Sequence, residues 1–271
     1  METREPNPTI LLNSAIASAD TARSCRFSWG RGVLAERLFC LGKQDAVEEL
    51  AERAASQRTS LCCSLNAYTF YHMSKDPFYA KVTREAEIAL ADGTSAFVLA
   101  RLQGLSGVER IPGCDLIEPL LAVAAFKGWP VLLIGPNRSN LERLRLRFLK
   151  RWPDLPLAIY QCVSAEGPGD DLWAMAKAWS PRIIFVGFAQ PYQELLMRRL
   201  RVCGAGLVMG VGGAFDVLSG RVRQTPVIMR KVGLEWLYRF FQKPVYRFRK
   251  TAVSIGWFPL WAVYRLIAQR R

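Results

Sequence analysis

The arrangement of short apolar runs between helical patterns constrains the fold of this chain more than any other feature. From residue 31 onward, these runs alternate with segments of helical periodicity. The pattern predicts strands over residues 36–41, 60–66, 130–135, 157–161, 182–187 and 206–211. It predicts helices over residues 44–56, 76–90, 94–103, 115–127, 138–151, 170–179 and 191–202. Such alternation indicates an α/β, Rossmann-like fold with a mostly parallel sheet and helices on both faces.

Several unusual residues follow the predicted strands directly. Asn66, Gly135, Gly187 and Gly212 each lie at or just after a predicted strand end. Because ligands of open α/β sheets bind beyond the carboxyl ends of the strands, we expect the functional site at this edge.

The formal charge of +14 over 271 residues is concentrated near the C-terminus. From residue 221 onward, twelve basic residues face one acid, Glu235, so this segment carries +11 and the remainder +3. A local basic field of this kind favours a polyanionic partner, which could be a membrane surface, a nucleic acid or a phosphorylated ligand.

The pattern also divides the chain into three parts. We expect residues 1–30 to be poorly ordered, residues 31–221 to form the α/β domain, and residues 222–271 to form a basic amphipathic appendage. The appendage is predicted to be helical over 226–242, with Pro244 in the first turn of a second helix.

The last part of the appendage combines aromatic and basic side chains. Its uncharged run, 251–264, is too short to cross a bilayer, and the chain has no apolar run of 18 residues, so we predict no membrane span. Trp257, Phe258, Trp261 and Arg265 are typical of an interfacial helix and favour contact with an anionic membrane surface. The alternative is a terminal helix that packs on its own domain through those aromatics.

Composition argues against several classes of site. The seven cysteines form no C-x-x-C pair, and the single histidine, His72, argues against histidine triads and histidine-rich metal sites. We therefore expect no disulfide framework, no metal and no cofactor.

The N-terminus lacks the basic and apolar regions of a signal peptide. The stretch 210–216 (GVGGAFD) fails the dinucleotide fingerprint, since Phe215 replaces its third glycine. The chain also has no D-x-D, the usual metal–diphosphate handle of sugar-nucleotide enzymes.

Four short motifs remain open between a structural and a chemical role. Asp92, before Gly93, either caps the helix 94–103 or does chemistry. Arg110 and Asp115 bracket a Pro-Gly turn, as an ion pair or as a clamp for phosphate or sugar. Gln193 and Glu194 begin a helix whose free N–H groups suit either capping or a diphosphate. Asp216 is equally suited to capping or function.

Taken in order, these motifs resemble one family. They are Ser64-x-Asn66, Asp92-Gly93, Arg110-x-x-Gly113-x-Asp115, Pro191-x-Gln193-Glu194, Gly210-x-Gly212-Gly213-x-Phe215-Asp216, Pro226, Gly233-Leu234-Glu235-Trp236-x-x-Arg239, Pro244 and Arg247. The chain resembles the WecG/TagA/CpsF family, glycosyltransferase family 26, over roughly residues 33–250. It departs from the family at Ser64, where Thr is usual, and at Ala189, where Gly is usual and a positive φ would strain alanine.

The resemblance implies an activity. It implies inverting, metal-independent transfer of a sugar from a UDP-sugar to a polyprenyl-diphosphate-linked saccharide, in bacterial exopolysaccharide or other surface-glycan synthesis. The location would be peripheral, on the cytoplasmic face of the inner membrane, and family cores can form homo-oligomers.

The resemblance also implies roles for residues. Asp92 would be the general base, which needs a pKa raised by partial burial. Ser64 and Asn66 would line the sugar pocket, Arg110 and Gln193 would hold the donor, and Asp115 would order Arg110. Gly212 and Asp216 would complete the substrate site. The cations expected to neutralise the departing diphosphate are Arg239, Arg247 and Arg249.

Two other functions stay open on sequence grounds. One is a basic nucleic-acid-binding module on an α/β core, although the sequence carries no RNA-binding motif and we expect no nucleic-acid partner. The other is a catalytically inactive membrane scaffold of the same family, against which the intact Asp92 argues.

Overall fold

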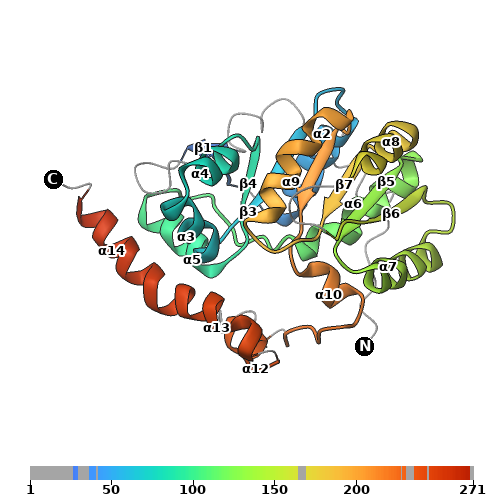
Figure 1. The fold of residues 1–271 in the computed structure, drawn as a ribbon. Helices are drawn as coiled ribbons and strands as arrows, with labels where there is room; N and C mark the ends of the chain where they lie inside the picture. Colours follow the sequence, from blue (N-terminus) through green and yellow to red (C-terminus); the bar gives the residue numbers. More distant parts are fainter. Residues whose placement is uncertain are drawn as a thin grey trace, which may run out of the picture.

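The computed structural model describes residues 27–29, 37–40, 42–163, 169–226, 228–229, 235–242 and 244–268. Its centre is an eight-stranded sheet in the order β1-β2-β4-β3-β8-β7-β5-β6, in which β2 to β8 are parallel and β1 pairs antiparallel with β2 (Figure 1). The strands are β1 (Phe27–Trp29), β2 (Arg37–Phe39), β3 (Ser60–Leu65), β4 (Ile88–Ala91), β5 (Val131–Gly135), β6 (Leu157–Gln161), β7 (Ile183–Val186) and β8 (Leu207–Gly210).

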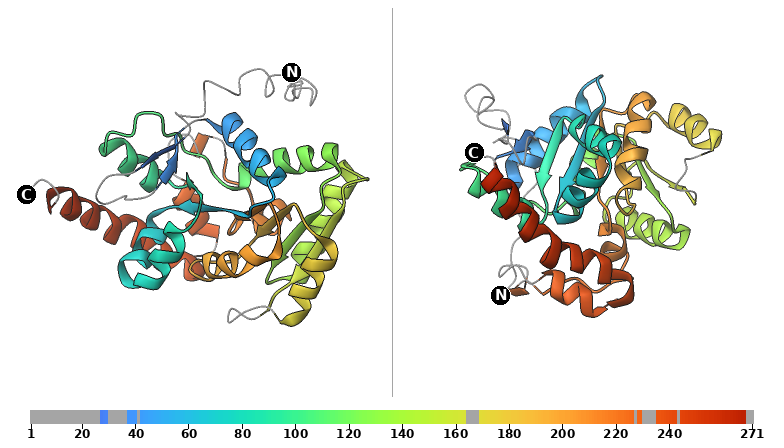
Figure 2. Two further views of the ribbon diagram at one scale, coloured as in Figure 1. Left: turned by 90° about the horizontal axis from the view of Figure 1, so that it is seen from above. Right: turned by 60° about the vertical axis from the view of Figure 1, so that its left-hand side comes forward.

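Helices cover both faces of this sheet, as the sequence predicts (Figures 1 and 2). One apolar core lies under α2 (Lys43–Ala55), α6 (Cys114–Lys127), α7 (Arg138–Arg151) and α10 (Ala214–Leu218). The other lies under α3 (Ala67–Lys75), α5 (Thr94–Leu102), α8 (Asp170–Trp179), α9 (Tyr192–Leu200) and α14 (Phe258–Ala268). The short helices α4 (Pro77–Arg84) and η1 (Arg201–Cys203) flank this second layer. Strands between two layers must be apolar on both sides, which explains unbroken runs such as IIFV in β7.

One predicted helix, 76–90, is wrong in its second half. The helix α4 ends at Arg84, and Ile88–Ala91 forms the buried strand β4. A fully buried strand has no alternating pattern, so periodicity does not separate four apolar residues from the end of a helix. The sequence reading also missed α3, which Asn66 caps through bonds to the N–H groups of Tyr68 and Thr69.

The expectation that residues 1–30 are poorly ordered concerns residues that lie mostly outside the described ranges. Within it, Phe27–Trp29 form β1, which pairs with β2. The helix predicted over 226–242 is described only in part, with α12 at Glu235–Gln242.

The C-terminal segment is helical and lies along one side of the sheet's carboxyl edge (Figure 1). It consists of α12, α13 (Pro244–Ala252), a π-helical turn η2 (Val253–Trp257) and α14. Pro259 has no N–H to donate and its ring crowds the carbonyl four residues earlier, so the wider turn before it lets the helix continue. Among the described residues, one helix, Phe248–Ala268, is long and apolar enough to cross a membrane by length and composition alone. Core helices of soluble proteins pass the same test, so the predicted lack of a span stays a prediction.

Three aromatics of this segment, Trp257, Phe258 and Trp261, face the body of the protein. Phe258 is 8% exposed and stacks on Phe70 at 5.8 Å between ring centroids, and Trp261 stacks on Phe70 at 5.7 Å. Trp257 contacts Tyr71 edge-to-face at 5.1 Å. The interfacial role predicted for these three aromatics is therefore corrected to docking on α3, the alternative that the sequence left open. Only Arg265 of that group is exposed.

A half-buried ion pair joins β3, β4 and η1 at the amino edge of the sheet. The carboxylate of Glu87 accepts from Arg201 at 2.6 and 3.2 Å and from the N–H of Leu61 at 2.9 Å. Burial raises the pKa of Glu87, but these hydrogen bonds outweigh it and leave the pKa below the ordinary value of 4.5. A carboxyl with a depressed folded-state pKa stabilises the protein above its unfolded pKa and loses this effect as the pH falls.

We therefore expect Glu87→Gln to lower the free energy of unfolding by about 1–2 kcal/mol at pH 7. The difference from the parent should shrink as the pH falls below 4.5 toward the depressed folded-state value. Urea denaturation at pH 7 and at pH 3.5 measures both quantities. An equal difference at the two pH values would contradict the assignment of this effect to the ionised carboxylate.

Candidate active site

A cavity of about 920 Å³ opens at the carboxyl edge of the sheet. Its walls come from the ends of β3, β4, β5, β7 and β8 and from the C-terminal helices that pass over this edge. The edge includes the point where β3 meets β8, from which the chain continues to α3 on one face of the sheet and to α10 on the other. Open α/β sheets place ligands at such a switch point. Eight of the site residues predicted from the sequence line the cavity: Ser64, Asn66, Asp92, Arg110, Gln193, Gly212, Asp216 and Phe258.

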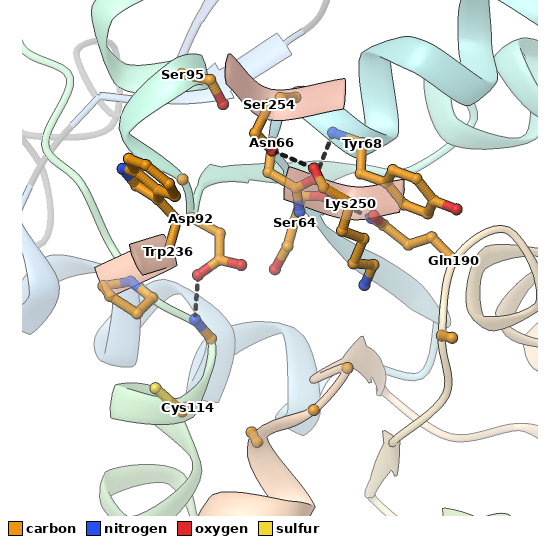
Figure 3. Close-up of a pocket in the computed structure, with 18 of the residues that line it drawn as sticks. Ser64, Asn66, Tyr68, Asp92, Ser95, Cys114, Gln190, Trp236, Lys250 and Ser254 are labelled. Atoms are coloured by element: carbon orange, nitrogen blue, oxygen red, sulfur yellow. Dashed lines mark hydrogen bonds between the residues drawn. The ribbon is translucent and has the colours of Figure 1, made fainter. Parts of the chain in front are cut away.

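Asp92 follows β4 directly and is half-buried in this cavity. It does not cap α5, because the N-cap position belongs to Gly93 and has no side-chain bond. Its Oδ1 accepts instead from the N–H of Gly113, at 3.3 Å, at the start of α6. Figure 3 shows its carboxylate pointing into the same space as the side chains of Ser64 and Lys250. The carboxylate is thus positioned in the cavity by a backbone donor.

Gly93 brings the ends of β3 and β4 together behind this carboxylate. A Cβ at Gly93 would lie 2.9 Å from the Cβ of Asn66, closer than real side chains approach. Asn66 itself caps α3: its Oδ1 accepts from Tyr68 and Thr69 at 2.9 and 3.1 Å. The Asp-Gly pair therefore serves both to place the acid and to fit it beside the α3 cap.

Gln193 has both ends of its amide bonded inside the protein. Its Oε1 accepts from the N–H of Gly212 at 2.6 Å, and its Nε2 donates to Glu194 at 3.1 Å. Gly212 has a φ of 53°, in the left-handed region that glycine tolerates. Gln193 thus fixes the loop after β8 and lines the cavity, and its role in holding the donor stays a prediction.

Gln190, which the sequence reading missed, completes this network. Its Nε2 donates to Thr69 Oγ1 at 2.8 Å and to Glu194 Oε1 at 3.2 Å. Burial raises the pKa of the Glu194 carboxyl, and the amide donors of Gln190 and Gln193 only partly oppose this. The bonds join the loop after β8 to the start of α3.

Asp216 lies in α10 at the far end of the cavity. Its Oδ1 accepts from Asn140 Nδ2 at 2.6 Å and from Arg221 at 3.5 Å. Asn140 also lines the cavity, and Asn137 caps its helix, α7. This polar end is built from two loops and two helix starts, which makes it suited to hydroxyl and amide groups of a ligand.

Ala189 stands in this region without backbone strain. Ser180 is the only non-glycine residue with positive φ in the described part of the chain. The doubt that the sequence raised about this loop is thus removed.

The predicted cations are placed unevenly. Arg110 lines the cavity, and Asp115 lies in the first turn of α6, where it accepts from the Cys114 thiol at 3.4 Å. The predicted Arg110–Asp115 pairing stays a prediction. Arg239 and Arg247 lie in α12 and α13, but their side chains are outside the described residues.

Lys250, not Arg249, is the described cation of α13 that lines the cavity. Arg249 is exposed, and a hydrogen bond to the Tyr71 hydroxyl raises its pKa. Lys250 lies over the Tyr68 ring, with Nζ 5.1 Å from the centroid (Figure 3). The sequence predicts a basic helix here but not the orientation of that helix about its own axis. This orientation determines whether Arg249 or Lys250 faces the cavity.

Within the described ranges, no group of three or more His, Cys, Asp or Glu side chains is arranged to hold a metal ion. The cavity nevertheless combines the carboxylates of Asp92 and Asp216, the cations of Arg110, Arg221 and Lys250, and several hydroxyl and amide groups. It can therefore accept a proton and bind anionic, hydroxylated ligands.

The comparison with known families agrees with this site and fold. A model of the "Glycosyl transferase WecG/TagA/CpsF family" matches residues 32–271, which is most of the chain and all of the cavity. The chain therefore belongs to the WecG/TagA/CpsF family of glycosyltransferases.

Proposed function

We propose that this glycosyltransferase moves a sugar from a UDP-sugar to a polyprenyl-diphosphate-linked saccharide, in bacterial exopolysaccharide or another surface glycan. The observation that carries the proposal is the Asp92 carboxylate, held by the Gly113 N–H inside a 920 Å³ cavity that also contains Lys250. An acid and a cation in one cavity suit a reaction that removes a proton and releases an anion.

The proposed step is a single displacement at the anomeric carbon. Asp92 takes the proton of the acceptor hydroxyl, the oxygen forms a bond to C1, and the bond from C1 to the diphosphate oxygen breaks as UDP leaves. Attack and departure on opposite faces invert the configuration. Because the chain has no D-x-D, we propose that protein cations, Arg110 and Lys250, stabilise the departing diphosphate without a metal.

The appendage supports a peripheral place at the cytoplasmic face of the inner membrane. The exposed apolar side chains of α14, which include Leu260 and Ile267, lie beside Arg265. Apolar and cationic groups together favour an anionic bilayer surface. We propose that these outward side chains, rather than Trp257, Phe258 and Trp261, make the membrane contact.

Incubation of the full chain with radiolabelled UDP-sugars and polyprenyl-diphosphate-linked saccharides, with EDTA present, tests the reaction. We expect label to enter the lipid fraction for at least one pair. Transfer that appears only after a divalent ion replaces EDTA would contradict the metal-free step. Absence of transfer from every donor, together with failure to bind UDP, would contradict the proposed function.

A further inference from the structure

The cavity does not end at the polar residues around Asp92. It continues between α5 and α14, where its walls become apolar. We call this extension the apolar groove and define it by Val98 and Leu102 of α5 and Phe258, Ala262, Val263 and Leu266 of α14. The groove and the polar site form one continuous space.

Both walls change from polar to apolar in the same direction. On α5, Thr94 and Ser95 line the cavity next to Asp92, and Val98 and Leu102 follow one and two turns later. On the other wall, Lys250 and Ser254 precede Phe258 and Ala262 at similar helical steps. Residues three and four apart share one face of a helix, so each helix presents a single graded stripe to the cavity. A ligand that fills the whole space must be polar at one end and apolar at the other.

The groove is open along part of its length. Val98 is 44%, Leu102 64% and Val263 56% exposed, whereas Phe258 and Ala262 are buried at its base. Exposed apolar surface that rims a polar site is typical of a ligand groove. An open apolar strip accepts a long chain that leaves the site, which a closed pocket could not.

The outer face of α14 adjoins the groove at Val263 but lies outside the cavity. Leu260, Tyr264 and Ile267 are exposed and do not line the cavity, and they recur on the side of the helix away from Phe258 and Ala262. The outer face provides matched controls, since its side chains are equally apolar and exposed but lack the continuity with Asp92.

We propose that the apolar groove binds the first isoprenoid units of the lipid-linked acceptor, next to its diphosphate. The inference rests on the proposed function for the identity of the acceptor. The saccharide hydroxyl lies at Asp92, and the isoprenoid chain runs between α5 and α14 toward the bilayer. The groove thereby selects the acceptor by its lipid, in addition to its sugar.

Kinetics with soluble acceptors test this selection without a membrane. Two acceptors share the saccharide and diphosphate but carry one or three isoprene units. We expect kcat/KM to be at least about tenfold higher for the longer chain, because it buries more apolar surface. The double variant Val98→Ser, Val263→Ser should lose this preference through KM while keeping the kcat for the short acceptor. The control Leu260→Ser, Ile267→Ser should keep the preference. Equal use of both chains by the parent protein, or an unchanged preference in the groove variant, would overturn the proposal.

Photo-crosslinking with a benzophenone-bearing farnesyl diphosphate provides a readout that needs no turnover. We expect labelled peptides from α5 and from the inner face of α14. Labelling confined to the outer face of α14 would overturn the proposal, since the isoprenoid chain would then contact that face and not the groove. If the groove is labelled but no acceptor is ever glycosylated, the groove assignment stands and the proposed function fails.

Discussion

Asp92→Asn is expected to lower kcat by about 10²- to 10⁴-fold, which is the usual contribution of a positioned general base. Asparagine has nearly the same size, and its amide oxygen can still accept the N–H of Gly113, which lies 3.3 Å from Oδ1 in the parent protein. It cannot take up the proton of the acceptor hydroxyl. The Kd for UDP should change by less than about twofold, because the loss belongs to the transition state and not to donor binding.

Asp76→Asn is the matched control for this variant. Asp76 caps α4 through bonds to Phe78 and Tyr79, and asparagine is an equally good cap. We expect full activity from this control. A variant at Asp92 that keeps most of the parent kcat, with label transfer measured under the same conditions, would contradict the base assignment.

Gln193→Leu is expected to lower the free energy of unfolding by about 2–4 kcal/mol. Leucine leaves the N–H of Gly212 without its acceptor at 2.6 Å and removes one of the amide donors to the buried Glu194 carboxyl. The Glu194 carboxyl is buried and keeps its full desolvation cost, whereas Gly212 is half-buried and keeps part of it. The left-handed turn at Gly212 should also lose its fixed shape. Because this turn lines the cavity, we expect kcat/KM for the donor to fall as well.

Urea denaturation of the variant and of Gln44→Leu separates this cause from a general effect of glutamine removal. Gln44 makes one exposed bond on α2, to Glu48. Its replacement should change stability by no more than about 0.5 kcal/mol. Equal effects at the two positions would show that the bond to Gly212 does not stabilise the loop.

Much of the sheet could be predicted from the sequence because it is parallel and doubly covered. Val131–Gly135, Ile183–Val186 and Leu207–Gly210 are unbroken apolar runs bounded by turn residues, and all three form strands close to the predicted bounds. Ile88–Ala91 has the same composition but follows a true helix after three residues. The local sequence does not distinguish this strand from a continuing helix. The segment is a strand because it pairs with β2 and β3.

The candidate site could be predicted where residue type and strand position were sufficient. Ser64 lies near the end of β3, whereas Asp92 and Gly212 come just after β4 and β8. All three reach one cavity because parallel strands end at one edge of the sheet. The inward role of Gln193 could not be predicted, since it depends on a bond to a loop 19 residues away. The rotation of α13 was equally hidden, so Lys250 rather than Arg249 lines the cavity. Phe258 and Trp261 of α14 pack inward because they stack on Phe70 of α3, a helix that the sequence did not predict.

The anomeric configuration of the transferred sugar tests the central claim most directly. The claim is that Asp92 activates the acceptor hydroxyl for one displacement at C1. The measurement is the one-bond carbon–hydrogen coupling at the anomeric carbon of the product, compared by NMR with that of the UDP-sugar donor. We predict the opposite configuration in the product. A product with the configuration of the donor would contradict the single displacement and, with it, the role assigned to Asp92.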